Sequence, residues 1–382
     1  MLEFCQALPK IELHAHLNGS IRNSTIRELA ASKGDAVGLA REDILKITED
    51  GDRNLAECFR LFDLIHKVTT EHTTVTRITR EVLQDFADDN VIYIEIRTTP
   101  KDNAKFGITK QSYLDSVLAG MEGYIHKGEG SKMMARLILS IDRRETTEQA
   151  LATVKLAAAY KTKGVVGIDL SGNPSIGEWA TFVPALRKAQ QQGLKVTLHA
   201  GEVTNSTEIK SMLEMQPDRL GHVCTFTDDE LESARDIPIE LCPTSNLRTE
   251  SVKSYGTHHF GKIYGRGMPV VLCTDDSGVF NTTLSKEYAI VADAFSMDEE
   301  AMLQLASKAV DYIFDASPNV RTVLKGKFSA AWMRWNASIL SQGAPCRSEA
   351  RKLGCMGRKP FGMSVAIFAV AAVCIVQAFA RT

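Results

Sequence analysis

The sequence predicts an α/β protein of the (β/α)8 or TIM-barrel type, in which eight parallel strands form a barrel surrounded by helices. Short apolar, β-branched segments recur eight times along the 382 residues. Segments with apolar positions at three- and four-residue spacing lie between them, which is typical of repeated βα units. We expect the strands at residues 11–17, 91–98, 135–142, 165–171, 195–199, 219–223, 237–242 and 269–274.

The intervening segments predict helices that would surround this barrel. The longest insertion, residues 20–90, separates the first two strands, and we expect it to hold several helices and to cover the barrel mouth. We expect helices at residues 55–67, 112–126, 146–160, 179–191, 228–235 and 298–314.

The composition is that of an ordinary globular protein, with 44% hydrophobic and 24% charged residues. Acidic residues number 47 and basic residues 45, a net charge of −2, so no overall field attracts nucleic acid. The eight cysteines are scattered and form no C-x-x-C pair, which favours reduced thiols. Residues 1–10 lack the pattern of a secretory signal, so we expect a cytosolic protein.

The continuous alternation of strands and helices predicts one catalytic domain over residues 1–328 and a divergent tail over residues 329–382. Residues 363–380 are almost wholly apolar and have about the minimum length of a bilayer span. A membrane anchor is one interpretation of this segment. We favour a helix docked on the domain or a non-native tail, and therefore expect no membrane association.

Chemically active side chains follow four of the predicted strands, at the point where each strand ends. In a (β/α)8 barrel those carboxyl ends gather at one face, where catalytic groups are found. Two histidines separated by a single residue on a strand project to the same side. The residues are His14 and His16 at the end of the first strand, His199 at the end of the fifth with Glu202 just beyond it, His222 at the end of the sixth, and Asp275 and Asp276 after the eighth.

Three imidazoles and one carboxylate are a ligand set that suits Zn²⁺ and leaves a position open for water. Bound zinc can lower the pKa of its water to near neutrality, which is the chemistry of a hydrolase. No lysine stands at the end of the fourth strand, where a carbamylated lysine would support a second metal ion. The sequence therefore predicts one catalytic zinc ion per chain.

Five motifs, in order along the chain, resemble those of the adenosine and AMP deaminase family. They are LPKIELHAHLNGS at residues 8–20, SGNP at 171–174, HAGE at 199–202, GH at 221–222 and CTDD at 273–276. The resemblance extends over about residues 3–328. It implies a zinc-dependent purine deaminase that works as a monomer.

The resemblance also implies a role for each matching residue. The zinc ligands would be His14, His16, His199 and Asp275. Glu202 would donate a proton to purine N1, and His222 would orient the attacking water and help to deprotonate it. Asp276 would contact purine N7 and the Gly172 backbone would contact N3.

The same resemblance places a further group of residues around the substrate. Thr98 and Thr99 would offer hydroxyl donors and Lys101 a cation to a phosphate. Residues expected to line the pocket for the sugar and the 5′ substituent are His16, Asn18, His66, Thr98, Thr99, Pro100, Lys101 and Asp142.

Within the family the chain is most similar to the adenosine deaminase-like branch, particularly that of plants, which deaminates N6-methyl-AMP. The segments RTTPK at 97–101, SIDRR at 140–144 and LFDLIHK at 61–67 resemble that branch. The implied reaction converts N6-methyl-AMP, and related N6-alkyl purine nucleotides, into IMP and methylamine. Alternatives are a deaminase of free adenosine, another mononuclear amidohydrolase, or a barrel with no catalytic role. The pair His258-His259 accompanies no carboxylate motif and is expected to be structural.

Overall fold

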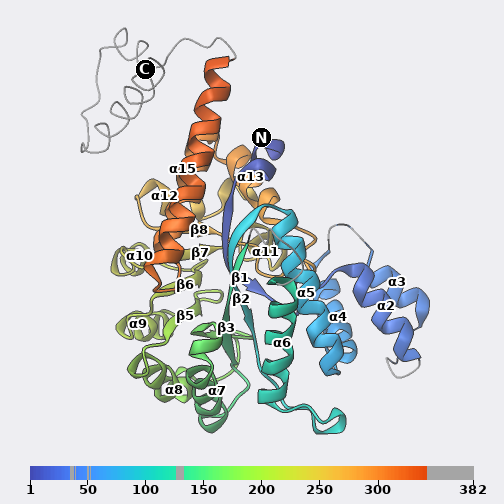
Figure 1. Ribbon diagram of the computed structural model, residues 1–382. Coiled ribbons are helices and arrows are strands. Elements are labelled where there is room, and N and C mark those ends of the chain that lie inside the picture. The colour runs from blue at the N-terminus through green and yellow to red at the C-terminus, as the bar shows by residue number, and fades with distance from the viewer. Residues whose placement is uncertain (35–37, 39, 50, 52, 126–132, 342–382) are drawn as a thin grey trace, which may run out of the picture. The chain divides into compact units, whose positions relative to one another are not determined.

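The computed structural model describes residues 1–34, 38, 40–49, 51, 53–125 and 133–341. Its eight strands form one parallel sheet in the order β1 to β8 (Figure 1). A parallel bridge between Ala15 and Asp275 links β1 to the residues after β8 and closes the barrel. The strands are β1 (Lys10–His16), β2 (Val91–Thr98), β3 (Met134–Asp142), β4 (Val165–Ser171), β5 (Lys195–Ala200), β6 (Arg219–His222), β7 (Ile239–Leu241) and β8 (Val270–Leu272).

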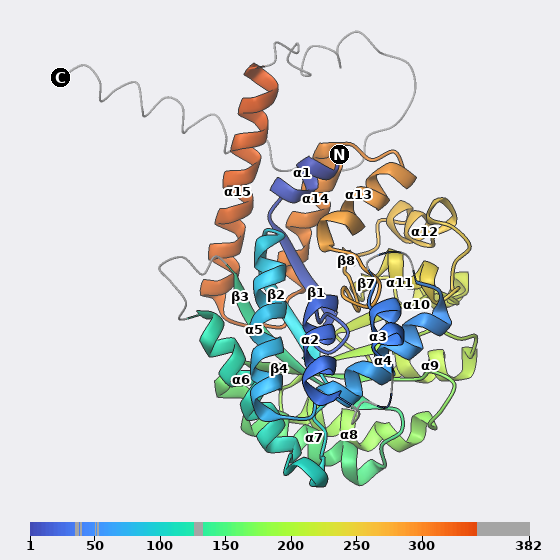
Figure 2. The ribbon, with the colours of Figure 1, turned by 90° about the vertical axis from the view of Figure 1, so that its right-hand side faces the viewer.

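Helices separate successive strands and surround the barrel (Figures 1 and 2). The α-helices are α1 (Leu2–Ala7), α2 (Asn23–Lys33), α3 (Arg41–Ile47), α4 (Leu55–Val68), α5 (His72–Asp88), α6 (Lys110–Ile125), α7 (Thr147–Ala159), α8 (Trp179–Gln191), α9 (Ser206–Glu214), α10 (Asp228–Ser233), α11 (Pro243–Arg248), α12 (Phe260–Gly265), α13 (Leu284–Ala294), α14 (Glu299–Lys308) and α15 (Pro318–Ser341). Short 3₁₀ helices are η2 (Ala104–Phe106), η3 (Lys161–Lys163), η4 (Tyr255–Thr257) and η5 (Ala309–Tyr312).

The predicted fold class is confirmed, and the differences concern element ends. The seventh strand, expected over residues 237–242, is only Ile239–Leu241. It begins after Pro238, which has no N–H to donate to the sheet. The helix expected over residues 298–314 changes to a 3₁₀ helix after Lys308.

The strands are buried on both faces, which explains their continuous apolar character. Charged side chains are the exception, and four of them form ion pairs with one another. Arg219 contacts Glu95 at 2.7 Å and Glu240 at 2.6 Å, and Arg97 contacts Glu240 at 2.8 Å. All four are fully buried, so a layer of ion pairs lies within the barrel.

The insertion between β1 and β2 contains α2, α3, α4 and α5 and packs beside the residues that follow β8. Its apolar cluster includes Ile65 together with Val279 and Phe280. The buried guanidinium of Arg53 donates to the carbonyls of Gly278, at 3.1 Å, and Val279, at 2.7 Å. These contacts fix the insertion against the loop that carries the two strand-eight aspartates.

The chain divides into two compact units, Met1–Trp332 and Met333–Thr382, each defined by contacts among its own residues. Of the second unit the structure describes only the last turns of α15, a helix that continues without a break through residues 328 and 329. Among the described helices, none combines the length and the apolar character that crossing a bilayer requires. The predicted apolar segment 363–380 lies outside the described residues.

Candidate metal centre and active site

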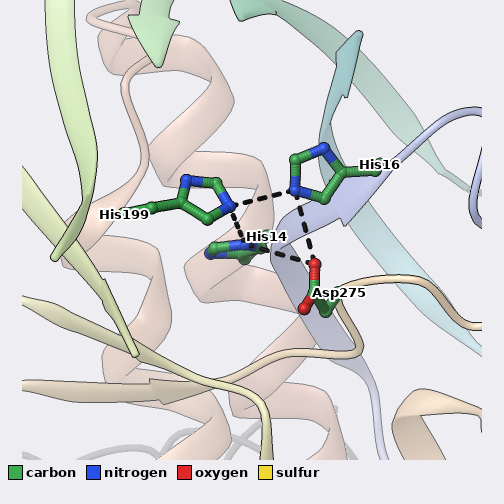
Figure 3. Close-up of side chains that lie close together, drawn as sticks. All are labelled: His14, His16, His199 and Asp275. Carbon is green, nitrogen blue, oxygen red and sulfur yellow. Dashed lines mark hydrogen bonds and ion pairs between the residues drawn. The ribbon is translucent and has the colours of Figure 1, made fainter. Parts of the chain in front are cut away.

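Four side chains from three distant parts of the chain point toward one another at the carboxyl end of the barrel (Figure 3). They are His14 and His16 of β1, His199 of β5 and Asp275 after β8. The Nε2 atom of His199 lies 3.2 Å from that of His14 and 3.1 Å from that of His16. The Oδ1 atom of Asp275 lies 3.5 Å from His14 Nε2 and 3.3 Å from His16 Nε2.

These four separations fit the coordination shell of a single ion. With zinc bonds to nitrogen and oxygen of about 2.0–2.1 Å, adjacent ligand atoms lie about 3–3.5 Å apart. One ligand atom from each of the four residues lies within 4.8 Å of every other. The donor set of three nitrogens and one oxygen is also the one that a borderline divalent ion prefers.

The hydrogen bonds behind the histidines orient their lone pairs toward the same point. The Nδ1 atom of His14 lies 2.7 Å from Glu240 Oε2, and that of His199 lies 2.9 Å from Asp169 Oδ1. Because an ionised carboxylate can only accept a hydrogen bond, each Nδ1 carries the hydrogen. The Nε2 atom of each neutral ring therefore has a free lone pair. Two such lone pairs 3.2 Å apart repel each other unless a cation lies between them. The residues present therefore fit a bound metal ion.

The charges around the cluster favour one added positive charge. Burial opposes a charged His14, yet hydrogen bonds to Asp275 and Glu240 raise its pKa to about 9. Burial lowers the pKa of His16 to about 3. Burial also opposes a charged Asp275, but the surrounding histidines hold its pKa well below its usual range. The cluster thus attracts a single positive charge, while burial disfavours a second proton on His16.

The loop after β8 presents its two aspartates differently. The carboxylate of Asp275 accepts a hydrogen bond from Ser245 at 2.7 Å, and its φ of 62° is in the left-handed region. Burial and the neighbouring charge of Asp275 raise the pKa of Asp276 well above its usual range. A Cβ on Gly19 would lie 1.6 Å from Asp276 Oδ1, so only glycine leaves room for that carboxyl.

Glu202 and His222 flank the metal cluster. The partly exposed Glu202 follows β5 by two residues, and desolvation raises the pKa of its carboxyl. The buried His222 ring lies 4.8 Å from the His14 ring and 5.1 Å from the His199 ring, centroid to centroid. Its Nε2 atom is 4.0 Å from Asp275 Oδ2, and burial lowers the pKa of the ring well below its usual range.

The predicted sugar and base contacts lie on loops at the same rim. The Asn18 Oδ1 atom is buried without a hydrogen-bond partner among the described residues, so it is an acceptor that a ligand hydroxyl can satisfy. Gly172 has a φ of 103°, and a Cβ there would approach Asp142 and the Arg143 nitrogen to 3.2 Å. A side chain at Gly172 would therefore be strained whether or not a purine is bound.

The residues predicted to bind a phosphate differ in exposure and in whether they already have a hydrogen-bond partner. Thr98 is buried, and its hydroxyl contacts Tyr113 Oη at 2.7 Å, whereas Thr99 is partly exposed. Pro100 is buried and leads to Lys101, for which the described part of the chain offers no hydrogen bond or ion pair. Burial and then the charge of Arg144 lower the pKa of Lys101. These observations leave Lys101 and Thr99 open to a ligand.

A second cation, not assigned from the sequence, lies beside this lysine. Arg144 binds both oxygens of Asp142, at 2.8 and 2.6 Å, and holds the pKa of that carboxyl below its usual value although burial opposes this. His66 of α4 lies close to the same group. Desolvation and the charge of Lys101 lower the pKa of His66, whose Nδ1 donates to Phe62 O at 2.7 Å.

Glu240 and Asp169, the carboxylates that support the histidines, were not predicted from the sequence. Both are fully buried near the middle of strands that are otherwise apolar. Charge inside such a strand was the signal that could have found them, because an unpaired buried charge is too costly to be retained.

A (β/α)8 barrel with three histidines and an aspartate converging at its carboxyl rim is the architecture of a metal-dependent hydrolase. The sequence pattern of the adenosine deaminase family matches residues 9–326, and the chain belongs to that family.

Individual relatives agree with this assignment. An N6-mAMP deaminase of Arabidopsis thaliana is 48% identical over 352 residues, which cover 86% of this chain and 99% of the relative. A human N6-methyl-AMP deaminase is 39% identical and covers 86% of this chain and 94% of its own. The crystal structure of Arabidopsis ADAL complexed with IMP has a TM-score of 0.81 and 48% identity, covering 86% of this chain and 98% of its own. The predicted family and the predicted enzyme class, a hydrolytic deaminase, are confirmed.

Proposed function

We propose that the enzyme hydrolyses N6-methyl-AMP to IMP and methylamine with one zinc ion per chain. The main supporting observation is the convergence of three Nε2 atoms and one carboxylate oxygen, with four of their six separations at 3.1–3.5 Å and all within 4.8 Å. Support for the nucleotide comes from the relatives named N6-methyl-AMP deaminase and from the Arabidopsis structures with IMP and GMP.

The reaction adds water to C6 of the purine and breaks the bond between C6 and the exocyclic nitrogen. Of the two water protons, one leaves with the methylamine and the other restores the proton that Glu202 gives to N1. A zinc ion held by His14, His16, His199 and Asp275 would supply acidification of the attacking water. Glu202 gives a proton to ring nitrogen N1, which makes C6 more electrophilic. The raised pKa of this carboxyl suits a group that must carry a proton near neutral pH.

The purine is oriented by groups on opposite sides of the site. Asp276 meets N7, and its protonated carboxyl can donate the hydrogen bond that an unprotonated ring nitrogen requires. The backbone of Gly172 meets N3, where the absence of a side chain lets the ring approach. Asn18 Oδ1 accepts a hydrogen bond from the sugar.

The 5′-phosphate binds Lys101 and the Thr99 hydroxyl, and Arg144 adds a second positive charge nearby. Lys101 is suited to this role because it has no partner of its own within the described ranges and is partly desolvated. An enzyme that used only the free nucleoside would gain nothing from a desolvated, unpaired cation at this position.

The test measures methylamine release from N6-methyl-AMP and from N6-methyladenosine. We expect Lys101→Ala to raise KM for the nucleotide by about tenfold or more, since a hydrogen bond to a charged group contributes about 1.5–3 kcal/mol. KM for the nucleoside should stay nearly unchanged. Lys105→Ala removes an exposed lysine four residues away and is the matched control. Equal effects of Lys101→Ala on both substrates would contradict the phosphate role.

We also propose a reducing compartment such as the cytosol. The five cysteines within the described ranges are unpaired, as expected where thiols are kept reduced. A monomeric state stays a prediction.

A further inference from the structure

The adjacent residues His258 and His259, which the proposed chemistry does not use, both contact the environment of His222. They lie between η4 and α12, and their rings stack with centroids 4.1 Å apart. His258 reaches the ring of His222 through Asn246, whereas His259 reaches its main chain. His258, Asn246 and His222 are each at most 4% exposed.

Three hydrogen bonds connect Phe260, His258, Asn246 and His222 in series. Their directions all follow from the first donor, a backbone N–H that can only donate. The amide nitrogen of Phe260 lies 2.9 Å from His258 Nδ1, so this ring nitrogen must accept. Burial, followed by the charge of His259, lowers the pKa of His258 to about 3, so the ring is neutral at physiological pH. A neutral His258 therefore carries its hydrogen on Nε2.

The next two hydrogen bonds transmit this choice to His222. Nε2 of His258 lies 3.1 Å from Asn246 Oδ1 and donates to it, which fixes the orientation of the Asn246 amide. The Nδ2 atom of Asn246 then donates to His222 Nδ1 at 3.1 Å. Because a neutral imidazole has one lone pair and one N–H, the hydrogen of His222 is confined to Nε2.

We propose that His258 and Asn246 are positioning residues that set the tautomer of His222, so that His222 meets the reacting water as a hydrogen-bond donor. Its Nε2 atom points to the side of the site where Asp275 lies, 4.0 Å from Oδ2. With Nδ1 held by Asn246, neutral His222 has no free lone pair with which to take a proton from the water. Of the two predicted actions of His222, orienting the water and deprotonating it, this geometry supports the first.

His259 stabilises the same residue through its backbone. Its Nε2 atom donates to the carbonyl of His222 at 2.6 Å. His222 and the following Val223 have φ values of 66° and 50°, in the left-handed region that non-glycine residues rarely adopt. The histidine pair thus holds both the backbone and the ring of His222, and these contacts explain why two histidines occupy this position.

The experiment records two-bond ¹H–¹⁵N spectra of the full, metal-loaded chain labelled with ¹⁵N-histidine, in which the two neutral tautomers give different cross-peak patterns. His222→Asn identifies the His222 signals by their loss. We expect the Nε2–H pattern in the unmodified protein and a mixed or Nδ1–H pattern in Asn246→Asp, whose carboxylate accepts from Nδ1. His258→Leu should give a mixed pattern, and His258→Gln, which retains a donor to Asn246, should restore most of the Nε2–H form.

The kinetic counterpart separates positioning from folding. We expect His258→Leu to lower kcat by about tenfold or more with little change in KM or metal content, and His258→Gln to recover most of the loss. An Nδ1–H pattern in the unmodified protein, or an unchanged His222 pattern in both His258→Leu and Asn246→Asp, would overturn the inference. The inference rests on the proposed function only in placing the water beside His222. The spectra need no substrate, so an inactive enzyme with the expected tautomer shifts would discard the function and not the positioning.

Discussion

Replacing Glu240 with glutamine should weaken metal binding, although Glu240 is not one of the four converging side chains. Its Oε2 atom accepts from His14 Nδ1 at 2.7 Å and from Arg97 at 2.8 Å, and its Oε1 atom accepts from Arg219 at 2.6 Å. Glutamine removes the negative charge and turns one of these acceptors into a donor. The hydrogen on His14 Nδ1 then loses its charged partner, and the orientation of the Nε2 lone pair is no longer enforced.

Two magnitudes follow from the complete burial of this carboxylate. Loss of a residue that orients a metal ligand typically costs about 10- to 100-fold in metal affinity. Breaking a buried ion pair on one side costs about 3–5 kcal/mol of stability. In Glu240→Gln, Arg97 keeps Asp169 and Arg219 keeps Glu95 as the carboxylate partner among the described residues.

Glu95→Gln is the matched control. Glu95 is equally buried and also pairs with Arg219, at 2.7 Å, but its other contacts are Tyr93 and the Phe314 nitrogen and not His14. Both variants should lose a similar free energy of unfolding in denaturant titrations of the metal-free protein. Competition with a chelator should show weakened metal binding in Glu240→Gln alone. Equal metal affinities in the two variants would refute the reasoning.

Three further predictions concern the site and the pH dependence of stability. Gly19→Ala should lower kcat/KM by about 100-fold with metal retained, because its Cβ would lie 1.6 Å from Asp276 Oδ1 and displace the group that we propose to meet N7. Normal activity would show that Asp276 is not needed there. Glu202→Gln should lower kcat by about 100-fold or more at unchanged metal content, measured by metal analysis and turnover; full activity would exclude it as proton donor. Burial raises the pKa of Glu287 from 4.5 to about 7, so the unfolded chain loses its proton first as pH rises. Its contribution to the free energy of unfolding is complete below about pH 4.5, declines up to about pH 7 and is constant above. Glu287→Gln should therefore gain up to about 3 kcal/mol in free energy of unfolding at pH 8, measured by urea titration. A variant less stable than the parent at that pH would contradict this.

The four converging side chains could be predicted because each one lies at, or just beyond, the carboxyl end of a recognisable strand. Apolar runs such as residues 91–98 and 165–171 mark strands whose carboxyl ends must meet once eight of them close a barrel. The topology alone brings His199 to His14, although 185 positions separate them.

The support behind those side chains could not be predicted in the same way. Glu240 contacts His14 across the barrel, 226 positions away, and neither residue's neighbours in sequence specify that pairing. Asn246 and His258 are only 12 positions apart, yet the direction of their hydrogen bond depends on the backbone of Phe260. Periodicity records which side chains are buried, but not which polar atoms they find there.

The barrel interior and the metal centre are therefore one electrostatic unit. Glu240 and Asp169 each bind a buried guanidinium and the Nδ1–H of a histidine, so the charges that allow Arg97 to be buried also orient His14 and His199. A carboxylate shared in this way cannot be optimised for stability alone. Replacing the ion pairs with apolar side chains of similar volume could stabilise the barrel, but it would release the two histidines, which explains why so costly a layer of charge lies beneath the site.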